Sequence, residues 1–217
     1  MCGRVATPRT EDIVRDLRLK MRTERNFDKN LNLAPTQLVP VITNQNPDEL
    51  QYFTWSLIPP FSQTGKPDFK MSTFNATAER LNSSPLWKPL VGKKHCVIIT
   101  SGFYEWNYDD PIKKKGPHPH YIHQIGSNYT FMAGLWSEWV NKETGEIVPS
   151  CTMITLPANE MMARIHNTKA RMPAFLTDQN RAEWINDRLS LTERMKCIEP
   201  VANDFLEAVE IEKPGVL

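Results

Sequence analysis

Cys2, the second residue of the chain, would offer two nucleophiles once the initiator methionine is removed, which a side chain this small at position 2 normally allows. Its α-amine, with a reference pKa of about 7.7–8.0, and its thiol, at about 8.5, are both partly reactive near neutral pH. An amine and a thiol on adjacent carbons condense with an aldehyde to an imine and then to a thiazolidine ring, without a metal or cofactor. Taken alone, a terminal cysteine is more simply an incidental residue on a frayed end, so the assignment depends on other side chains.

Glu105 is the first of these candidates, in the stretch Gly102-Phe103-Tyr104-Glu105-Trp106. The preceding apolar, β-branched run from Cys96 to Thr100 predicts a buried central strand. A carboxyl group buried among aromatic rings should have a raised pKa, which suits a general acid or base. A surface glutamate on an edge strand explains the pattern equally well.

Asn75 and His166 are candidates of the same kind. Asn75 lies where a helix cap is expected, and its amide can also bind a hydroxyl or a carbonyl of a ligand. His166 ends a short predicted helix that begins at Asn159, and the negative end of the helix dipole favours its protonated form. Lys169 and Arg171 then form a basic loop suited to phosphates. Simple capping roles explain Asn75 and His166 equally well.

Trp55 and Phe61 lie near the ends of a stiff loop built on Pro59 and Pro60. Aromatic rings stack on nucleobases of any type, so the two side chains are candidates for a base-stacking platform. Burial statistics favour a plainer interpretation, in which Trp55 belongs to the core and Phe61 is a surface hydrophobe.

The elements that must position these side chains are short. In 217 residues with 40% hydrophobic content, 17 prolines against 9 glycines favour many short segments with stiff turns. We expect an α+β fold: one β-rich domain spanning 1–217, of mostly antiparallel strands with short flanking helices. The pattern predicts a capped helix at Thr10 and a hairpin with strands 38–42 and 50–55 about a turn at 46–48. It also predicts long strands over 129–139 and 147–156, a hairpin loop over 107–116, helices over 177–189 and 192–197, and a final strand over 208–213. Pro40 indicates an edge or a bulge in the first hairpin strand.

Composition excludes several classes of protein. A net charge of +1 and a pI of about 7.7 mean that any nucleic-acid binding must come from a local basic patch. The absence of a signal-like start and of a long apolar run indicates a cytoplasmic protein without a membrane segment. Cys2, Cys96, Cys151 and Cys197 are unpaired in spacing, as in reduced thiols. His118, His120 and His123 lack a completing carboxylate or cysteine, so we expect no metal.

Six stretches in this order resemble the motifs of the SOS-response-associated peptidase (SRAP) family. They are Met1-Cys2-Gly3-Arg4, Asn32-Leu33-Ala34-Pro35-Thr36, Trp55 with Ile58-Pro59, Asn75-Ala76 with Glu79, Gly102 to Trp106, and Ile165-His166 with Arg171-Met172-Pro173. The resemblance spans nearly the whole chain. It implies an SRAP fold that binds single-stranded DNA and crosslinks covalently to abasic sites through a thiazolidine at the terminal cysteine. It also implies self-removal of the leading residue, abasic-site lyase activity, crosslink reversal and a place in the DNA-damage (SOS) response, with no cofactor.

The resemblance also implies roles for individual residues. Cys2 would be the nucleophile, Asn75 would hold the opened sugar, Glu105 would shuttle protons, and His166 would act as acid and base at the sugar. Family members carry arginine where this chain has Thr77, so Arg80 is expected to replace that phosphate contact. The expected DNA-binding side chains are Arg4, Trp55, Phe61, Arg80, Trp106 and Arg171, acting in a monomer.

The principal alternative is an N-terminal-nucleophile amidohydrolase or glutaminase, which also begins Cys-Gly and uses its own α-amine as the base. Those domains need downstream Asn-Gly and Gly-Asp elements for the oxyanion hole and the substrate amine. None of the 9 glycines here follows Asn or precedes Asp, which disfavours this class. A binding module with an accidental cysteine is disfavoured further by the six ordered motifs.

Overall fold

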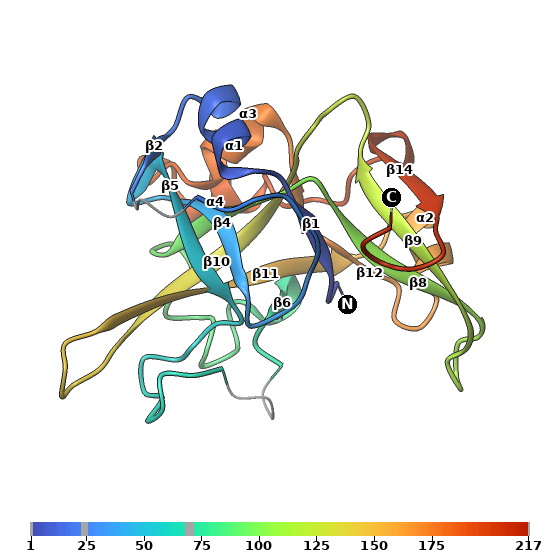
Figure 1. Cartoon of the computed structure of the whole chain (residues 1–217). Coiled ribbons are helices and arrows are strands. Elements are labelled where there is room, and N and C mark those ends of the chain that lie inside the picture. The colour runs from blue at the N-terminus through green and yellow to red at the C-terminus, as the bar shows by residue number, and fades with distance from the viewer. Residues whose placement is uncertain (1, 23–25, 68–71, 217) are drawn as a thin grey trace.

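Five strands form the framework of the fold (Figure 1). The structure is a computed structural model that describes residues 2–22, 26–67 and 72–216. The strands are β4 (Leu38–Thr43), β5 (Asn46–Trp55), β7 (His95–Thr100), β10 (Thr130–Val140) and β11 (Ile147–Pro157). They pair antiparallel in the order β5-β4-β7-β10-β11. A short parallel pairing of Cys151 with Trp55 joins β11 back to β5 and closes a barrel. The expected β-rich, mostly antiparallel fold is confirmed.

Strand β7 is buried on both faces, as the sequence predicts. Cys96 and Ile98 belong to one apolar cluster with Val41 and Met132, whereas Val97 and Ile99 belong to a second cluster. Side chains of a strand point alternately to opposite faces. A continuous apolar run therefore results wherever both faces are covered.

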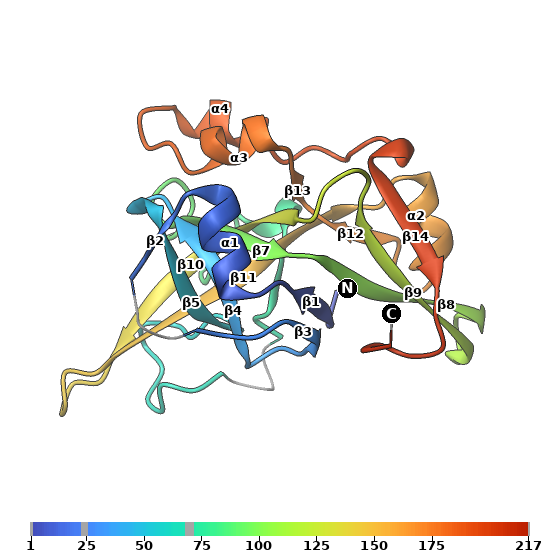
Figure 2. The same cartoon turned by 45° about the horizontal axis from the view of Figure 1, so that its top comes forward.

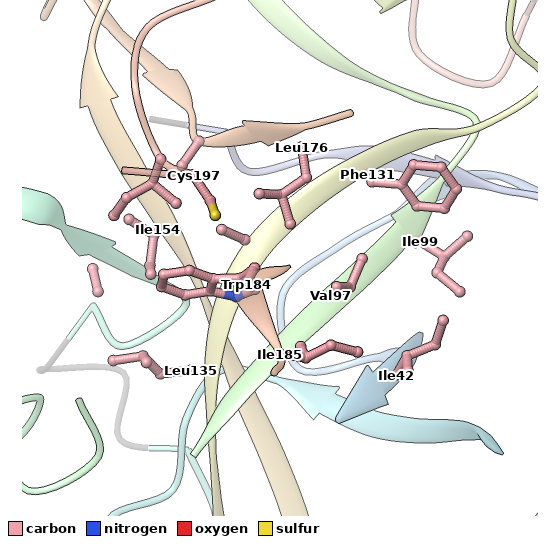
Figure 3. Packing of buried hydrophobic residues seen from close by; sticks show 14 of the residues in the cluster. Ile42, Val97, Ile99, Phe131, Leu135, Ile154, Leu176, Trp184, Ile185 and Cys197 are labelled. Carbon is pink, nitrogen blue, oxygen red and sulfur yellow. The ribbon is translucent and has the colours of Figure 1, made fainter. Parts of the chain in front are cut away.

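Three helices cover the second cluster on one side of the barrel (Figure 2). They are α1 (Thr10–Leu17), α3 (Asp178–Trp184) and α4 (Leu191–Met195). Trp184 is fully buried in this cluster, where Figure 3 shows it among aliphatic side chains from several elements, and its Nε1–H donates to the Cys96 carbonyl at 2.9 Å. Helix α3 is shorter than predicted. The helix ends at Trp184, and beyond it the Asp187 carboxylate accepts hydrogen bonds from Asn44 at 2.8 Å and from Arg194 at 3.0 Å.

A second sheet carries the start of the chain. Its order is β14 (Leu206–Glu210), β9 (Lys115–Gln124), β8 (Gly102–Asp110), β1 (Val5–Thr7) and β3 (Asn30–Leu33). Val5 pairs with Phe103 on one side and with Leu33 on the other, so the N-terminal strand lies inside this sheet. The predicted hairpin loop over 107–116 shrinks to a four-residue turn because β8 and β9 pair as far as Asp110 and Lys115.

The remaining elements are short. They are β2 (Lys20–Met21), β6 (Asn75–Thr77), η1 (Ala78–Arg80), α2 (Glu160–Ile165), β12 (Arg171–Pro173), β13 (Phe175–Leu176) and η2 (Asn203–Phe205). Strand β6 pairs parallel to β11, with Asn75 opposite Met153. In the described part of the chain, no helix is both long and apolar enough to cross a membrane.

Two local predictions are wrong, and a third is confirmed in part. The β4–β5 turn falls at 44–45 and not at 46–48, because the strand ladder extends to a pair between Thr43 and Asn46. The cap of α1 is Arg9, since the Thr10 hydroxyl instead bonds Tyr52 at 2.6 Å and accepts from the Phe27 amide at 2.8 Å. Pro40 is on a barrel strand, and the expected irregularity lies next to it, between Val41 and Thr43.

Candidate active site

Cys2 lies at the start of the chain, against the backbone of the second sheet. It is buried, with 1% exposure, and its thiol donates weakly to the Arg4 carbonyl at 3.6 Å. The Tyr104 amide donates to the same Arg4 carbonyl at 2.9 Å, which continues the β1–β8 ladder toward the start of the chain. Burial raises the pKa of the Cys2 thiol, and the nearby charge of Glu105 adds to this effect. Met1, which the first motif includes, lies outside the described residues.

Asn75 contacts Cys2 directly. Its Nδ2 donates to the Cys2 carbonyl at 2.8 Å, and the side chain is buried. The helix-cap interpretation is wrong, because Asn75 begins strand β6 and the following 3-10 helix is capped at Thr77. The amide does hold a carbonyl, but the carbonyl belongs to the protein.

Glu105 is buried on β8, close to this N-terminal segment. Its side chain is 5% exposed, and burial raises its pKa to about 7. The surface interpretation is therefore wrong, and the predicted rise in pKa is confirmed. A carboxyl group of this pKa is about half protonated at neutral pH, so it can both give and take a proton.

His166 faces Glu105 from the end of α2. Its Nε2 lies 3.9 Å from Glu105 Oε2, and its Nδ1 lies 2.8 Å from the Arg171 carbonyl. The helix begins with the predicted cap, in which Asn159 accepts from the Met162 amide at 2.9 Å. The expected protonated state is wrong, since burial lowers the pKa of His166 to about 4 despite its place at a helix end. A six-residue helix has too weak a dipole to offset that desolvation.

A cavity of about 430 Å³ opens beside Cys2 and Asn75, although neither of these two residues is part of its wall. Its wall includes Glu105 and His166, and also Gly3 and Arg4, which directly follow Cys2. The wall also contains Trp106, Phe74, Tyr108, Ser72, Thr168, Lys114 and Lys169. The site thus combines a proton-transfer pair with aromatic rings and three cations.

Trp55 lies in the barrel and not on the cavity wall. It is completely buried, and its Nε1–H donates to the Phe74 carbonyl at 2.9 Å. The two rings meet edge to face at 6.0 Å between centroids. Because Phe74 lines the cavity, Trp55 supports the site from behind and has no surface on which a base could stack. Phe61 is 74% exposed and lies outside the cavity wall.

Two of the predicted phosphate ligands are also away from the cavity wall. Arg171 forms a two-pronged ion pair with Glu79, at 2.6 and 3.0 Å, and donates to the Thr155 carbonyl at 2.6 Å. Its guanidinium is therefore already engaged by the protein. Arg80 is exposed on η1. Of the predicted DNA-binding side chains, Arg4 and Trp106 line the cavity.

Sequence reasoning missed Lys114, and it did not assign Lys169 to the cavity wall. Lys114 belongs to the Lys113-Lys114-Lys115 run, which the sequence presents as a solvated patch at a hairpin tip. Strand β8 starts at the site and runs nine residues to the turn that carries Lys114, after which the chain returns as β9. A longer predicted strand after Gly102 would have shown that this turn belongs to the same hairpin as Glu105. Within the residues that the structure describes, no cluster of His, Cys, Asp and Glu could hold a metal ion.

A family model and one of the two relatives named below match this chain along nearly its full length. Residues 1–214 match the family described as SOS response associated peptidase (SRAP). Abasic site processing protein YoqW of Bacillus subtilis is 34% identical over 216 residues, covering 97% of this chain and 92% of its own. Abasic site processing protein HMCES of Xenopus tropicalis is 29% identical over 168 residues, covering 69% of this chain and 49% of its own.

Solved structures show the same fold. A crystal structure of a protein from Bacteroides thetaiotaomicron superposes with a TM-score of 0.85 at 25% identity, covering 97% of this chain and 92% of the other. A protein from Bordetella bronchiseptica superposes with a TM-score of 0.81 at 20% identity, covering 98% and 100%. The ordered motifs, the fold and the family match agree, and the chain belongs to the SOS response associated peptidase family.

Proposed function

We propose that this protein processes abasic sites in single-stranded DNA by forming a thiazolidine crosslink between Cys2 and the ring-opened sugar, after removal of Met1. The observation that carries the proposal is the hydrogen bond from Asn75 to the Cys2 carbonyl, beside a cavity lined by Glu105 and His166. The names of the related proteins given above support the same substrate.

The chemistry balances with the groups at hand. The Cys2 amine adds to the sugar aldehyde, and one amine proton passes to the new oxygen. The hydroxyl takes a second proton from an acid and leaves as water, which gives a protonated imine. The thiol then gives its proton to the base left by that acid, its sulfur adds to the imine carbon, and the ring closes with one proton on nitrogen. Holding the aldehyde against both nucleophiles makes each step intramolecular, which can contribute several kcal/mol.

Glu105 is suited to the proton transfers in this sequence. With a pKa raised to about 7 by burial, it supplies a proton to the departing hydroxyl in its acid form. The resulting carboxylate then accepts the proton of the thiol, whose own raised pKa keeps it protonated until that step. Taking the thiol proton returns Glu105 to its acid form, and the ring nitrogen keeps the proton that it retained when water left, so one carboxyl group serves both steps.

His166 complements Glu105 as a neutral side chain. At its lowered pKa of about 4 it carries one proton at neutral pH, so one ring nitrogen can accept. We assign it to the sugar hydroxyl, where it would also serve in opening the sugar and in strand cleavage by the lyase activity. Reversal of the crosslink and self-removal of Met1 are the further activities that we propose for this site.

The DNA strand would pass along the cavity with its phosphates near cations. Arg4, Lys114 and Lys169 line the wall and provide three such contacts. Trp106 lies on the same wall and is the base-stacking candidate. Arg80 and Phe61 would contact flanking nucleotides beyond the cavity. We further propose that one copy of the chain acts alone, as one domain, in the cytoplasm.

The direct test uses a labelled single-stranded oligonucleotide with one abasic site. Wild-type protein should give an adduct that survives heat and denaturant, and Cys2→Ala should give none. Cys197→Ala is the matched control, because Cys197 is also buried but lies in the helix-covered cluster. Intact mass should show loss of Met1 and an adduct lighter by one water than the sum of its parts. No wild-type adduct, or an equal adduct with Cys2→Ala, would refute the proposal.

A further inference from the structure

The ion pair of Glu79 and Arg171 ties three elements together behind the cavity. Glu79 lies on η1 and Arg171 begins β12. Both prongs of the guanidinium bond the carboxylate, at 2.6 and 3.0 Å, and one also donates to the Thr155 carbonyl of β11 at 2.6 Å. A two-pronged contact fixes orientation as well as position.

The backbone of the same arginine contacts the His166 ring. A carbonyl can only accept, so the 2.8 Å contact between His166 Nδ1 and the Arg171 carbonyl favours a ring proton on Nδ1. The Arg171 amide also points at Nδ1 as a donor, which only an unprotonated Nδ1 could accept, but at 3.4 Å it is the longer and weaker of the two contacts. With the proton on Nδ1, the acceptor nitrogen is Nε2, which faces Glu105 Oε2 at 3.9 Å.

The peptide between His166 and Arg171 is a tight turn. The Lys169 and Ala170 amides both donate to the His166 carbonyl, at 3.2 and 2.8 Å, and Ala170 has a φ of +47°. That left-handed conformation is unfavourable for alanine. The turn therefore gains from an anchor on its far side, and the Arg171 side chain supplies one.

We propose that Glu79 is a positioning residue of the active site, which holds Arg171 so that its carbonyl keeps the proton of His166 on Nδ1 and presents Nε2 to Glu105 and the cavity. This inference deepens the proposed function and rests on it for the effect on reaction rate. It also gives Arg171 a different task from the phosphate contact suggested by family resemblance.

The structure offers a matched control on the element that carries His166. Glu160 and Arg164 form an ion pair at 2.8 Å on α2, and both side chains are largely exposed. The Arg164 guanidinium donates to the Glu160 carboxylate, whereas the His166 ring contacts the Arg171 carbonyl. Glu160→Ala removes a carboxylate from an arginine as Glu79→Ala does, without touching the proposed linkage.

The first measurement needs no activity. Long-range proton–nitrogen NMR correlations of the five histidines report which ring nitrogen carries the proton, and His166→Gln identifies the signals of His166. Wild type and Glu160→Ala should show the Nδ1–H form alone. Glu79→Ala should show a mixture of both forms, and Glu79→Gln, which keeps one acceptor for Arg171, should lie between. Glu79 is half-exposed, so both variants should fold.

The second measurement separates DNA affinity from reaction rate. Crosslinking is followed in single turnovers over a range of protein concentrations, with oligonucleotides that contain one abasic site. The rate at saturation should fall about tenfold in Glu79→Ala, by analogy with metal-bound histidines that lose the partner orienting them, while the half-saturating concentration stays unchanged. Glu160→Ala should match wild type in both.

The outcomes divide clearly. An unchanged His166 proton position in Glu79→Ala overturns the proposal, and so does a shifted proton with an unchanged saturated rate. If Arg171→Ala and Glu79→Ala alter only DNA affinity, Arg171 is a phosphate ligand and the proposal is again overturned. A wild-type protein that forms no crosslink refutes the proposed function instead, and the NMR result still decides whether Glu79 sets the His166 ring.

Discussion

Replacing Glu105 with glutamine should stabilise the protein at alkaline pH while impairing its reaction. Burial raises the pKa of this carboxyl from 4.5 to about 7. The folded protein therefore holds a proton that the unfolded chain has released, and the wild type loses stability as pH rises from 4.5 through 7. Glutamine has nearly the same shape and does not titrate, so Glu105→Gln lacks this loss.

The magnitude follows from the pKa difference. Each pKa unit corresponds to about 1.4 kcal/mol, so the rise corresponds to about 3 kcal/mol, of which about 2.5 kcal/mol should be lost between pH 5 and pH 8.5. The side chain is 5% exposed, so solvent screening reduces this figure little. On the functional side, the loss of a general acid and base should slow crosslinking by about a hundredfold or more, with DNA affinity retained.

The assay is urea unfolding of wild type and Glu105→Gln at pH 5 and pH 8.5. The difference in free energy of unfolding between the two proteins should shift by about 2.5 kcal/mol in favour of the variant at the higher pH. Comparing the two proteins cancels every other titrating group that they share. Glu160→Gln, at an exposed carboxyl, should show no such shift. A pH-independent difference for Glu105→Gln would refute the reasoning about its buried charge.

Three further perturbations test other parts of the structure. The pKa of His166 falls from 6.5 to about 4 on folding, so the folded protein binds fewer protons there than the unfolded chain. Wild type should therefore lose stability relative to His166→Gln as pH drops from 6.5 toward 4. Urea unfolding of both proteins at pH 7 and pH 4.5 checks this, and a constant difference in unfolding free energy would contradict it. Trp55→Phe removes one of the two donors to the Phe74 carbonyl, leaving the Met153 amide at 3.0 Å, and should cost about 1 kcal/mol of unfolding free energy for the lost hydrogen bond, whereas half-buried Trp106→Phe should cost little; equal losses would argue against the buried hydrogen bond. Gly134→Ala would place a methyl group 2.7 Å from the Thr152 carbonyl oxygen and should destabilise the barrel by about 1–3 kcal/mol or more, so an unchanged thermal midpoint would contradict the close approach at this glycine.

The sequence was most informative where one local pattern decides the structure. Apolar β-branched residues predicted β7, and Asn159 predicted the start of α2. Glu105 was identified because a carboxyl group among aromatic side chains is unusual in itself. In each case the physical signal lies within a few neighbouring residues.

The sequence failed where the partner is distant in the chain. Asn75 has the appearance of a helix cap, and only the parallel pairing of β6 with β11 brings its amide to Cys2. His166 was expected to be charged because it ends a helix. The sequence could not show that strands far from α2 in the chain bury it. Arg171 was expected to face DNA because Glu79, 92 residues away, cannot be recognised as its partner from spacing alone.

The pairing of Val5 between Phe103 and Leu33 has a consequence for when the chain could react. During synthesis the N-terminal cysteine leaves the ribosome first, and His166 and β14 follow much later. A nascent, truncated or misfolded copy thus carries the aminothiol without its neighbours. In the proposed chemistry, an immature chain would have both nucleophiles but not the pairing of Glu105 with His166 that assists the proton transfers.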